Sequence, residues 1–318
     1  MGGSRSRGLA LALAATLLWS TTSVLIDPLV NHFGLSPIQV SLWRALLVTG
    51  MLAGIIVASR PRRVWPGLRA LLYYAVYGAI GIAVLSVLWS RSVQVNKASV
   101  ATALIFSAPV FVAIGSRWLV RERIGAWTAA AVGLNVAGCA LVAGVVGAHG
   151  VRAPSLVGLG LGLASGVAFA AYTLLGRGAG RVSDVSPLVV LAWVFGWGTL
   201  ALLGWGLAAQ GPAVVHPALD AGGWGLLLAL AAGPTLLGYL CYTASVVTTP
   251  AIVVSLLSTL ELPITAFLAR VLLGRRLDGW QSLGAAAILL GAVVLQVWGA
   301  VRGRRRRLAL SQPIVPGP

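Results

Sequence analysis

The chain has 318 residues, of which 58% are hydrophobic and only 9% charged, and its formal net charge is +17. With a mean hydropathy of +0.94, this composition excludes an ordinary soluble domain and is typical of an integral membrane protein. The positive charge does not indicate nucleic-acid binding, because most arginines stand at the ends of apolar runs. Anionic headgroups and the positive-inside rule account for arginines in those places.

Ten apolar runs, each bounded by Pro, Gly or charged residues, predict ten transmembrane helices. In chain order they cover residues 8–28, 37–58, 69–89, 97–119, 125–146, 155–177, 186–209, 221–243, 249–271 and 279–301. The first run follows a basic start that resembles a signal peptide, but it is too long for an h-region. No clear cleavage site follows it, so we interpret it as an uncleaved span. The short connections leave no room for a soluble domain, and we expect an all-α membrane protein.

The two halves of the chain repeat each other. At an offset of 150, Pro37 and Trp43 match Pro187 and Trp193, and at an offset of 153, Arg117, Arg123, Trp127 and Gly138 match Arg270, Arg276, Trp280 and Gly291. Each repeat holds five spans, an odd number, so the second repeat enters the membrane inverted relative to the first. Inverted repeats are typical of secondary transporters, whose site lies near the midplane between the halves. The predicted units are residues 1–148, residues 149–301 and a basic cytoplasmic tail, 302–318.

The distribution of basic residues predicts that both termini are cytoplasmic, in a multi-pass protein of a bacterial inner membrane. Arg270, Arg275 and Arg276 then lie outside, against the positive-inside rule. The repeat explains this exception, because the arginine cluster that follows span 4 on the inside reappears after span 9 on the outside.

Sequence motifs for other chemistry are missing. Cys139 and Cys241 fall inside apolar runs and are interpreted as small core residues. His32, His149 and His216 fall in predicted outer loops and are interpreted as solvated residues. Because there is no nucleotide loop, metal-ligand spacing or nucleophile motif, we expect no cofactor, no metal site, no catalytic residues and no ATP-driven pumping.

The segment ASVATALIFSAPVFVAIGSRWLVRERIGAWTAAAVGLNVAG resembles the signature of spans 4 and 5 in the EamA-type transporters of the drug/metabolite transporter superfamily. In that signature a small-residue start leads to a Pro, a Glu-Arg pair, an aromatic residue and a Gly-rich helix. The corresponding residues here are Pro109, Glu122, Arg123, Trp127, Gly133 and Gly138. Arg44, early in span 2, also resembles the family's arginine. The second repeat departs from the pattern, because Arg275 stands where the family usually has Glu, and Pro263 is one place off.

The resemblance implies a ten-helix carrier with both termini in the cytoplasm, no prosthetic group and a central cavity lined by spans 1–4 and 6–9. Such carriers move amino acids, metabolites or drugs, often outwards. We therefore expect an exporter that binds a small-molecule substrate, is surrounded by membrane lipids and works by alternating access. Protons are one candidate coupling ion, and substrate, direction and oligomeric state stay open. A membrane-embedded enzyme is the second hypothesis and a channel or scaffold the third. An enzyme would need paired acids or a catalytic His within the spans, and the inverted repeat argues against a simple pore.

Helical spacing places polar and aromatic residues on shared faces of most spans, as in span 9, where Ser255, Ser258 and Glu261 line one face. Such stripes could equally join helices to one another. The residues predicted to bind substrate are Arg44, Glu261, Trp19, Trp43, Tyr77, Tyr172, Trp193, Tyr239, Tyr242 and Ser258. Proline occurs inside spans 4, 8 and 9, at Pro109, Pro234 and Pro263. There it either frees a backbone carbonyl for the cavity or simply kinks the helix.

Arg44 and Glu261 are the two formally charged residues deep within predicted spans, which makes them candidates for a functional site. We expect both to face one aqueous cavity, where they hold charges of the substrate or each other. The alternatives are a purely structural ion pair or an Arg44 that caps backbone carbonyls. Glu261 is either a fixed anchor, for example for an amine of the substrate, or a site of proton coupling.

Overall fold

The computed structural model describes residues 2–117, 125–142, 155–273, 279–280 and 282–294, and every regular element within these ranges is helical. Glu122, Arg123, Arg275 and the tail 302–318 lie outside the described residues, as does the boundary predicted between 148 and 149.

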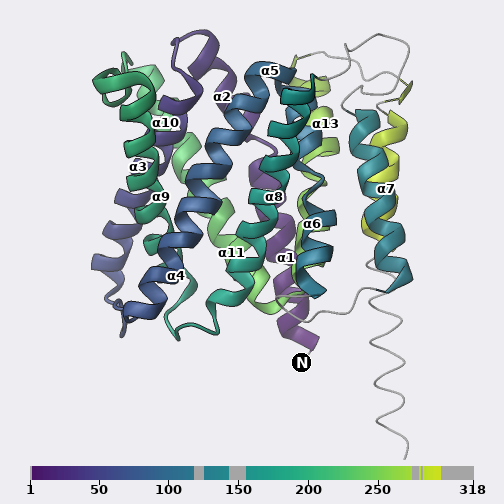
Figure 1. The fold of residues 1–318 in the computed structure, drawn as a ribbon, viewed down its shortest axis with the longest axis horizontal. Helices are drawn as coiled ribbons and strands as arrows, with labels where there is room; N and C mark the ends of the chain where they lie inside the picture. Colours follow the sequence, from purple (N-terminus) through teal and green to yellow (C-terminus); the bar gives the residue numbers. More distant parts are fainter. Residues whose placement is uncertain (1, 118–124, 143–154, 274–278, 281, 295–318) are drawn as a thin grey trace, which may run out of the picture.

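Spans of the first half run between the two ends of the molecule, and some of them consist of more than one helical segment (Figure 1). In chain order the helical segments are α1 (Gly2–Trp19), α2 (Thr22–Asn31), α3 (Pro37–Ser59), α4 (Leu68–Gly78), the π-helical segment η1 (Ala79–Val84), α5 (Leu85–Ile105), α6 (Ala108–Gly115) and α7 (Ala126–Val142).

The second half has a corresponding series. It consists of α8 (Leu156–Ala179), α9 (Pro187–Gln210), the 3-10 segment η3 (Gly211–Val215), α10 (Ala221–Leu230), the π-helical segment η4 (Ala231–Leu237), α11 (Gly238–Thr248), α12 (Ala251–Ser258), α13 (Glu261–Leu273) and an unlabelled helix, Ser282–Val294.

Helix starts follow from local sequence and repeat between the halves. Ser36 caps α3 by accepting a hydrogen bond from the backbone N–H of Gln39 at 3.1 Å, and Gln39 Oε1 accepts from the N–H of Ser36 at 2.9 Å. Ser186 caps α9 in the same way, by accepting from Val189 N–H. Pro follows the cap in both helices, because the first helical residue needs no N–H donor.

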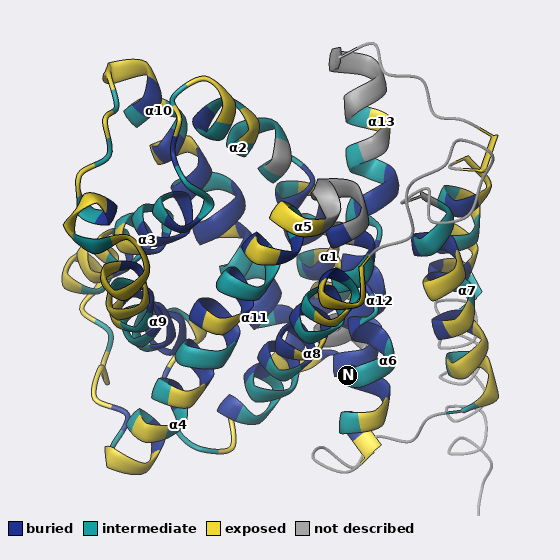
Figure 2. Ribbon diagram, turned by 45° about the horizontal axis from the view of Figure 1, so that its top comes forward, coloured by how far each residue is buried: buried dark blue, intermediate teal, exposed yellow. Residues whose placement is uncertain are grey.

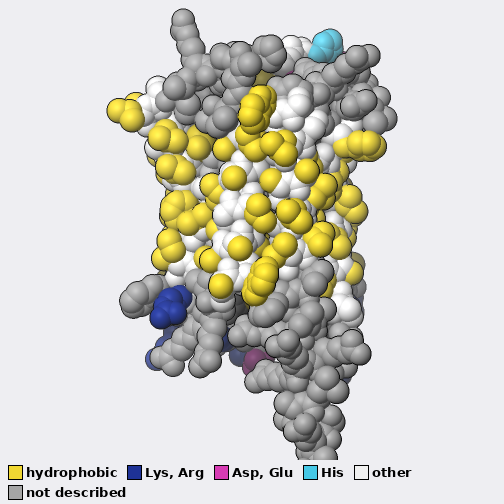
Figure 3. All heavy atoms as spheres, turned by 90° about the vertical axis from the view of Figure 1, so that its right-hand side faces the viewer, with side chains coloured by type: hydrophobic (Ala, Val, Ile, Leu, Met, Phe, Trp, Pro, Cys, Tyr) yellow, Lys and Arg dark blue, Asp and Glu magenta, His cyan; other side chains and the backbone are white. Residues whose placement is uncertain are grey.

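Six described segments are long and apolar enough to cross a membrane, and they match six of the ten predicted spans. They are Ser6–Asn31, Pro37–Ser59, Leu68–Val95, Leu156–Ala179, Pro187–Val215 and Ala221–Thr248. At the places of the other four predicted spans, the described apolar helices are shorter: Ala103–Gly115, Ala126–Leu141, Ala251–Thr265 and Ser282–Val294. Figure 3 shows a belt of hydrophobic side chains around the middle of the molecule, with Lys and Arg gathered at its lower end. Figure 1 places the N-terminus at that same end.

Contacts with α8 show where the chain turns between the third and fourth predicted spans. A Cβ atom at Gly81 would meet Tyr172, and one at Gly176 would meet the hydroxyl of Tyr77, so this part of the chain runs antiparallel to α8. A Cβ at Gly162 would meet Leu104, and one at Gly166 would meet Ser107, so that later part runs parallel to α8. The chain therefore reverses within α5, although helical bonding continues through it.

Buried residues follow the inner faces of α8, α9 and α11 and cover the whole of α12, as the burial colouring of Figure 2 also shows. The helix α7 lies at the edge of the molecule, against the helix Ser282–Val294 (Figures 1 and 2). A Cβ at Gly138 would lie 2.7 Å from the carbonyl oxygen of Gly284, so the two backbones approach closely. Small residues permit such contacts between membrane helices.

Candidate functional site

The fourth and ninth spans are each interrupted near the middle, at equivalent positions. The α-helical assignment stops at Phe106–Ser107, between α5 and α6, and at Thr259–Leu260, between α12 and α13. These positions differ by the offset of 153 that relates the two repeats. In both spans the break precedes the proline, so Pro109 and Pro263 fall in the first turn of the new helix, where a missing N–H is harmless. The result is a pair of broken helices at mid-depth, as in many transporter sites.

The third and eighth spans carry π-helical segments, η1 and η4, again at equivalent positions. Pro234 lies within η4, and Gly81 lies within η1 with the ring of Tyr172 against it. Because η1 contains no proline, proline cannot be the shared cause of the two π-helical segments. Single π turns inside α-helices are frequent at functional sites, because they rotate the following side chains relative to the rest of the helix. Here Tyr77 stands just before η1, and Tyr239 stands just after η4.

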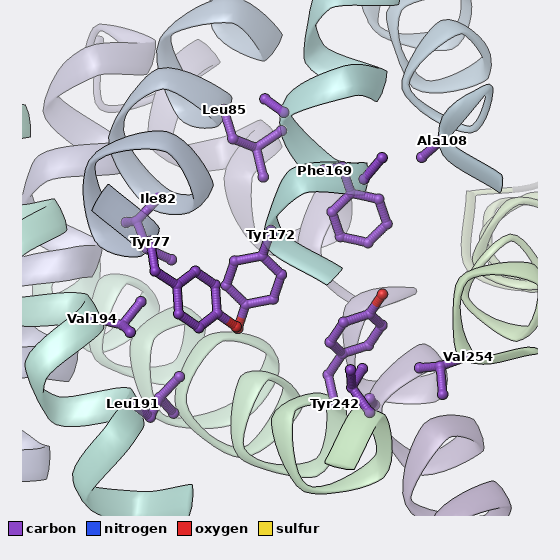
Figure 4. Close-up of a cluster of buried hydrophobic side chains, with 14 of the residues drawn as sticks. Tyr77, Ile82, Leu85, Ala108, Phe169, Tyr172, Leu191, Val194, Tyr242 and Val254 are labelled. Carbon is purple, nitrogen blue, oxygen red and sulfur yellow. The ribbon is translucent and has the colours of Figure 1, made fainter. Parts of the chain in front are cut away.

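Aromatic side chains from both halves meet between these irregular segments. The ring of Trp19 lies 5.2 Å from that of Tyr239 and 4.9 Å from that of Tyr242. Tyr172 joins the group from α8, with its ring 4.9 Å from that of Tyr77 and 5.4 Å from that of Tyr239. Figure 4 shows Tyr77, Tyr172, Phe169 and Tyr242 around this centre. The five aromatic residues that the sequence predicted in spans 1, 3, 6 and 8 therefore form one cluster.

Hydroxyl groups hold two of these rings in place between α8 and α11. The hydroxyl of Tyr172 is 3.1 Å from that of Thr243, and the hydroxyl of Tyr242 is 2.6 Å from that of Thr173. Thr173 donates its own proton to the carbonyl of Phe169 at 3.0 Å, so Tyr242 is the donor in the second pair. The two crossed pairs explain why these buried phenols are satisfied without water.

The charged residues Arg44 and Glu261 come from opposite repeats and approach the cluster at Tyr239. The phenol of Tyr239 lies within electrostatic range of both side chains. Arg44, on α3, and Glu261, the first residue of α13, are both partly buried. Within the described part of the chain neither takes part in an ion pair or hydrogen bond. No ion pair joins Arg44 to Glu261 among the described residues, so the expectation that they hold charges of a substrate stays a prediction.

Glu261 has a local reason to stand where it does. It occupies the first turn of α13, at the positive end of the helix dipole. A carboxylate is stabilised at this end of a helix, and the break at Thr259–Leu260 creates such an end inside the protein. The equivalent residue of the first repeat is Ala108, so only the second repeat supplies an acid.

Three of the predicted site residues are engaged elsewhere. The indole N–H of Trp43 donates to the carbonyl of Val214 at 3.3 Å, and that of Trp193 donates to the carbonyl of Val64 at 3.1 Å. The two indoles thus bind connecting segments at opposite ends of the bundle. Ser258 is fully buried and donates to the carbonyl of Ser255 at 2.7 Å within its own helix. All three stay predictions as substrate contacts, and a substrate would have to compete with these hydrogen bonds.

Phe169 belongs to the cluster although it was not among the predicted site residues. Its ring lies 6.0 Å from that of Trp19 and 5.8 Å from that of Tyr242. The signal was present in the sequence, because Phe169 is the repeat equivalent of Trp19. Metal binding has no visible basis here, since no three His, Cys, Asp or Glu side chains gather within the described ranges.

Comparisons with known proteins place this geometry in a family. The EamA-like transporter family matches the chain twice, over residues 6–144 and over residues 156–297. Among solved structures, one described only as "Crystal structure of protein" is similar to the chain over 92% of its length and 98% of that structure, with 18% identity and a TM-score of 0.75. At this identity the likeness shows the fold alone. Among curated proteins no match is found.

Proposed function

Because this chain belongs to the EamA-like transporter family, we propose that it exports small metabolites, amino acids or drug-like compounds across the bacterial inner membrane by alternating access. The family consists of membrane transporters, and the coarse assignment to solute transport follows from membership. Substrate class, direction and mechanism are the proposed part.

The proposal is supported by the proximity of Tyr239 to both Arg44 and Glu261, beside the aromatic cluster that joins the two repeats. The two opposite charges come from different repeats, lie near the same phenol and form no ion pair with each other among the described residues. Partly buried charges are costly unless they are matched. A substrate with a carboxylate for Arg44 and an amine for Glu261 would match both at once. An amino-acid zwitterion has these two groups, and the surrounding aromatic rings would accept an apolar side chain.

The arrangement of the repeats supports a carrier over a permanent pore. Aromatic rings at contact distance fill the middle of the bundle, so solute would pass only after the helices rearrange. The inverted repeat offers a simple route, because each half can adopt the conformation of the other and so open the opposite end. Broken and π-helical segments in the third, fourth, eighth and ninth spans are the places where such a rearrangement would be absorbed.

Counterflow into sealed liposomes tests the proposal. The purified full chain is reconstituted, the vesicles are loaded with a mixture of unlabelled amino acids, and uptake of each ¹⁴C-labelled amino acid is measured. A carrier gives uptake that is accelerated by the internal solute and saturates with the external one. Uptake without this acceleration would indicate a channel, and chemical conversion of the solute would indicate an enzyme. Absence of any protein-dependent flux would refute the zwitterion class.

Variants of the two charges give the assignment its residue-level test. We expect Arg44→Ala and Glu261→Gln to reduce counterflow about tenfold or more, the loss given by one buried charge-assisted contact. The matched controls Arg62→Ala and Asp184→Asn remove exposed charges of the same kinds and should keep the wild-type rate. Glu261→Gln also separates the two roles of Glu261. An anchor shows weaker substrate affinity, whereas a proton-coupling site shows unchanged affinity and loss of the pH dependence of transport.

A further inference from the structure

The break in the ninth span is held by side chains of the first repeat. Thr16, on α1, shares its hydroxyl proton between the carbonyls of Ala12 at 2.8 Å and Leu257 at 3.3 Å. On the other side of the span, the amide of Asn135, on α7, donates to the hydroxyl of Thr259. Asn135 and Thr259 are both fully buried. The two contacts thus hold the ninth span at Leu257, just before its break, and at Thr259, in the break.

The hydroxyl of Thr259 completes this arrangement, because it donates a hydrogen bond to the carbonyl of Leu256 at 2.7 Å. That carbonyl lies in the last turn of α12, where acceptors lose their helical partners. A third contact follows the break, where Thr265 of α13 donates to the carbonyl of Ser20 at 3.2 Å. Both halves of the ninth span are therefore tied to elements of the first repeat.

The equivalent break in the fourth span is built differently. At the place of Thr259 stands Phe106, and at the place of Asn135 stands Ile288; these two belong to one apolar cluster. At the place of Thr16 stands Gly166, and the freed carbonyl of Leu104 accepts instead from the neighbouring Ser107 at 2.7 Å. Among the described residues, the first break has only this local hydroxyl contact and is packed by apolar groups. The second also has a local hydroxyl contact, from Thr259, but adds polar contacts from distant parts of the chain.

The asymmetry coincides with the position of the acid. Glu261 follows Thr259 by two residues, whereas the equivalent of Glu261 beside the apolar break is Ala108. A backbone that carries a functional carboxylate must hold its position closely, and buried hydrogen bonds are more directional than apolar contacts. The polar contacts of Thr16 and Asn135 occur at the break beside Glu261, where such accuracy is needed.

We propose that Asn135 and Thr16 are positioning residues, which fix the broken ninth span from the first repeat and so set the place of Glu261 beside Tyr239 and Arg44. Neither residue touches the substrate in this scheme. The significance for transport rests on the proposed function of Glu261, but the positioning itself can be tested without a substrate.

Labelling of Glu261 by dicyclohexylcarbodiimide, which reacts with carboxyl groups in apolar surroundings, is the test. The full chain in detergent is treated with the reagent, and the rate of modification at Glu261 is followed by mass spectrometry. We expect Asn135→Leu and Thr16→Val to change this rate about fivefold, the factor given by loss of one net hydrogen bond. Thr259→Ser keeps the hydroxyl and should keep the wild-type rate. Ile288→Val, at the place equivalent to Asn135, is the matched control and should also leave the rate unchanged.

A double variant separates positioning from a loss of stability. Asn135→Leu with Thr259→Val removes both polar partners, which restores much of the thermal stability lost in a single variant. Positioning predicts that the labelling rate stays altered in this stable double variant. A wild-type rate in the double variant, or in folded Asn135→Leu and Thr16→Val proteins, would overturn the inference. An altered rate together with normal counterflow by Glu261→Gln would instead keep the positioning and reject the proposed function of Glu261.

Discussion

The hydroxyl oxygens of Thr49 and Thr199 lie 2.9 Å apart, and these two residues are separated by 150 positions, which is the offset of the repeat. A residue can touch its own repeat equivalent only near the pseudo-two-fold axis. The crossing of α3 and α9 at these threonines therefore marks the axis of the inverted repeat. Other contacts obey the same symmetry, because Trp193 and Val214 are the equivalents of Trp43 and Val64 and exchange partners with them.

Removing the contact on the axis should reveal a coupling between the halves. Thr49 donates its proton to the carbonyl of Ala45 at 2.8 Å, so Thr199 is the donor in the pair. We expect Thr199→Val and Thr49→Val each to lower the free energy of unfolding by about 0.5–1.5 kcal/mol, the usual value of one hydrogen bond. The double variant should be less destabilised than the sum of the two. Thermal unfolding in detergent measures this, and strictly additive losses would contradict the contact.

The two tryptophan hydrogen bonds, Trp43 to Val214 and Trp193 to Val64, should act as latches, contacts that keep opposite ends of the carrier closed. Trp43→Phe and Trp193→Phe keep an aromatic ring but lose the N–H donor. Loss of this hydrogen bond should shift the equilibrium between the closed and open conformations of that end by about fivefold. We expect Trp43→Phe to open the centre towards the end at Val214, and Trp193→Phe to open it towards the end at Val64. A cysteine at Ser255, in a background without Cys139 and Cys241, would report this by its reaction with a membrane-impermeant maleimide added from each side. Equal effects of both variants on both sides would contradict the latches.

Close packing between the halves should make Gly78 intolerant of a side chain. A Cβ atom there would collide with the carbonyl oxygen of Val194, whereas one at Gly54 would meet nothing within 4 Å. Gly78→Ala should reduce the free energy of unfolding by about 1–3 kcal/mol through overpacking. Gly54→Ala is the control and should leave it unchanged or raise it by about 0.4–1 kcal/mol. The midpoints of thermal unfolding of the two variants decide the comparison.

Reporter fusions test the membrane orientation. On the face that Figure 3 shows, the visible Lys and Arg side chains lie at the end that holds the N-terminus, so we expect fusions at the N-terminus and in the loop that contains Arg62 to report the cytoplasm. A fusion after Arg276, which lies outside the described residues, should report the opposite side despite its positive charge. A cytoplasmic signal there would refute the odd-numbered inverted repeat.

The membrane class, the repeat and most of the aromatic cluster could be predicted because each depends on short-range pattern. Apolar runs specify spans through their length, and Trp, Pro and Arg in register reveal the repeat even in a chain rich in Ala and Leu. Helical spacing placed Tyr239 and Tyr242 on one side of the eighth span, and packing brings them to Trp19. Prolines marked three of the four irregular spans, since Pro109 and Pro263 follow the breaks and Pro234 lies within η4, but the π-helical segment η1 of the third span contains no proline.

By itself, the sequence determined that the chain is a membrane-embedded helical protein with two homologous halves, since hydropathy and residue identity are local properties. Only the tertiary structure decided that no ion pair joins Arg44 to Glu261 within the described ranges, and that Trp43 binds Val214 at one end of the bundle. It also decided that Asn135 reaches the break at Thr259. These contacts join residues far apart in the chain, and which of several polar groups meet is determined by how the helices cross and by where each helix is interrupted.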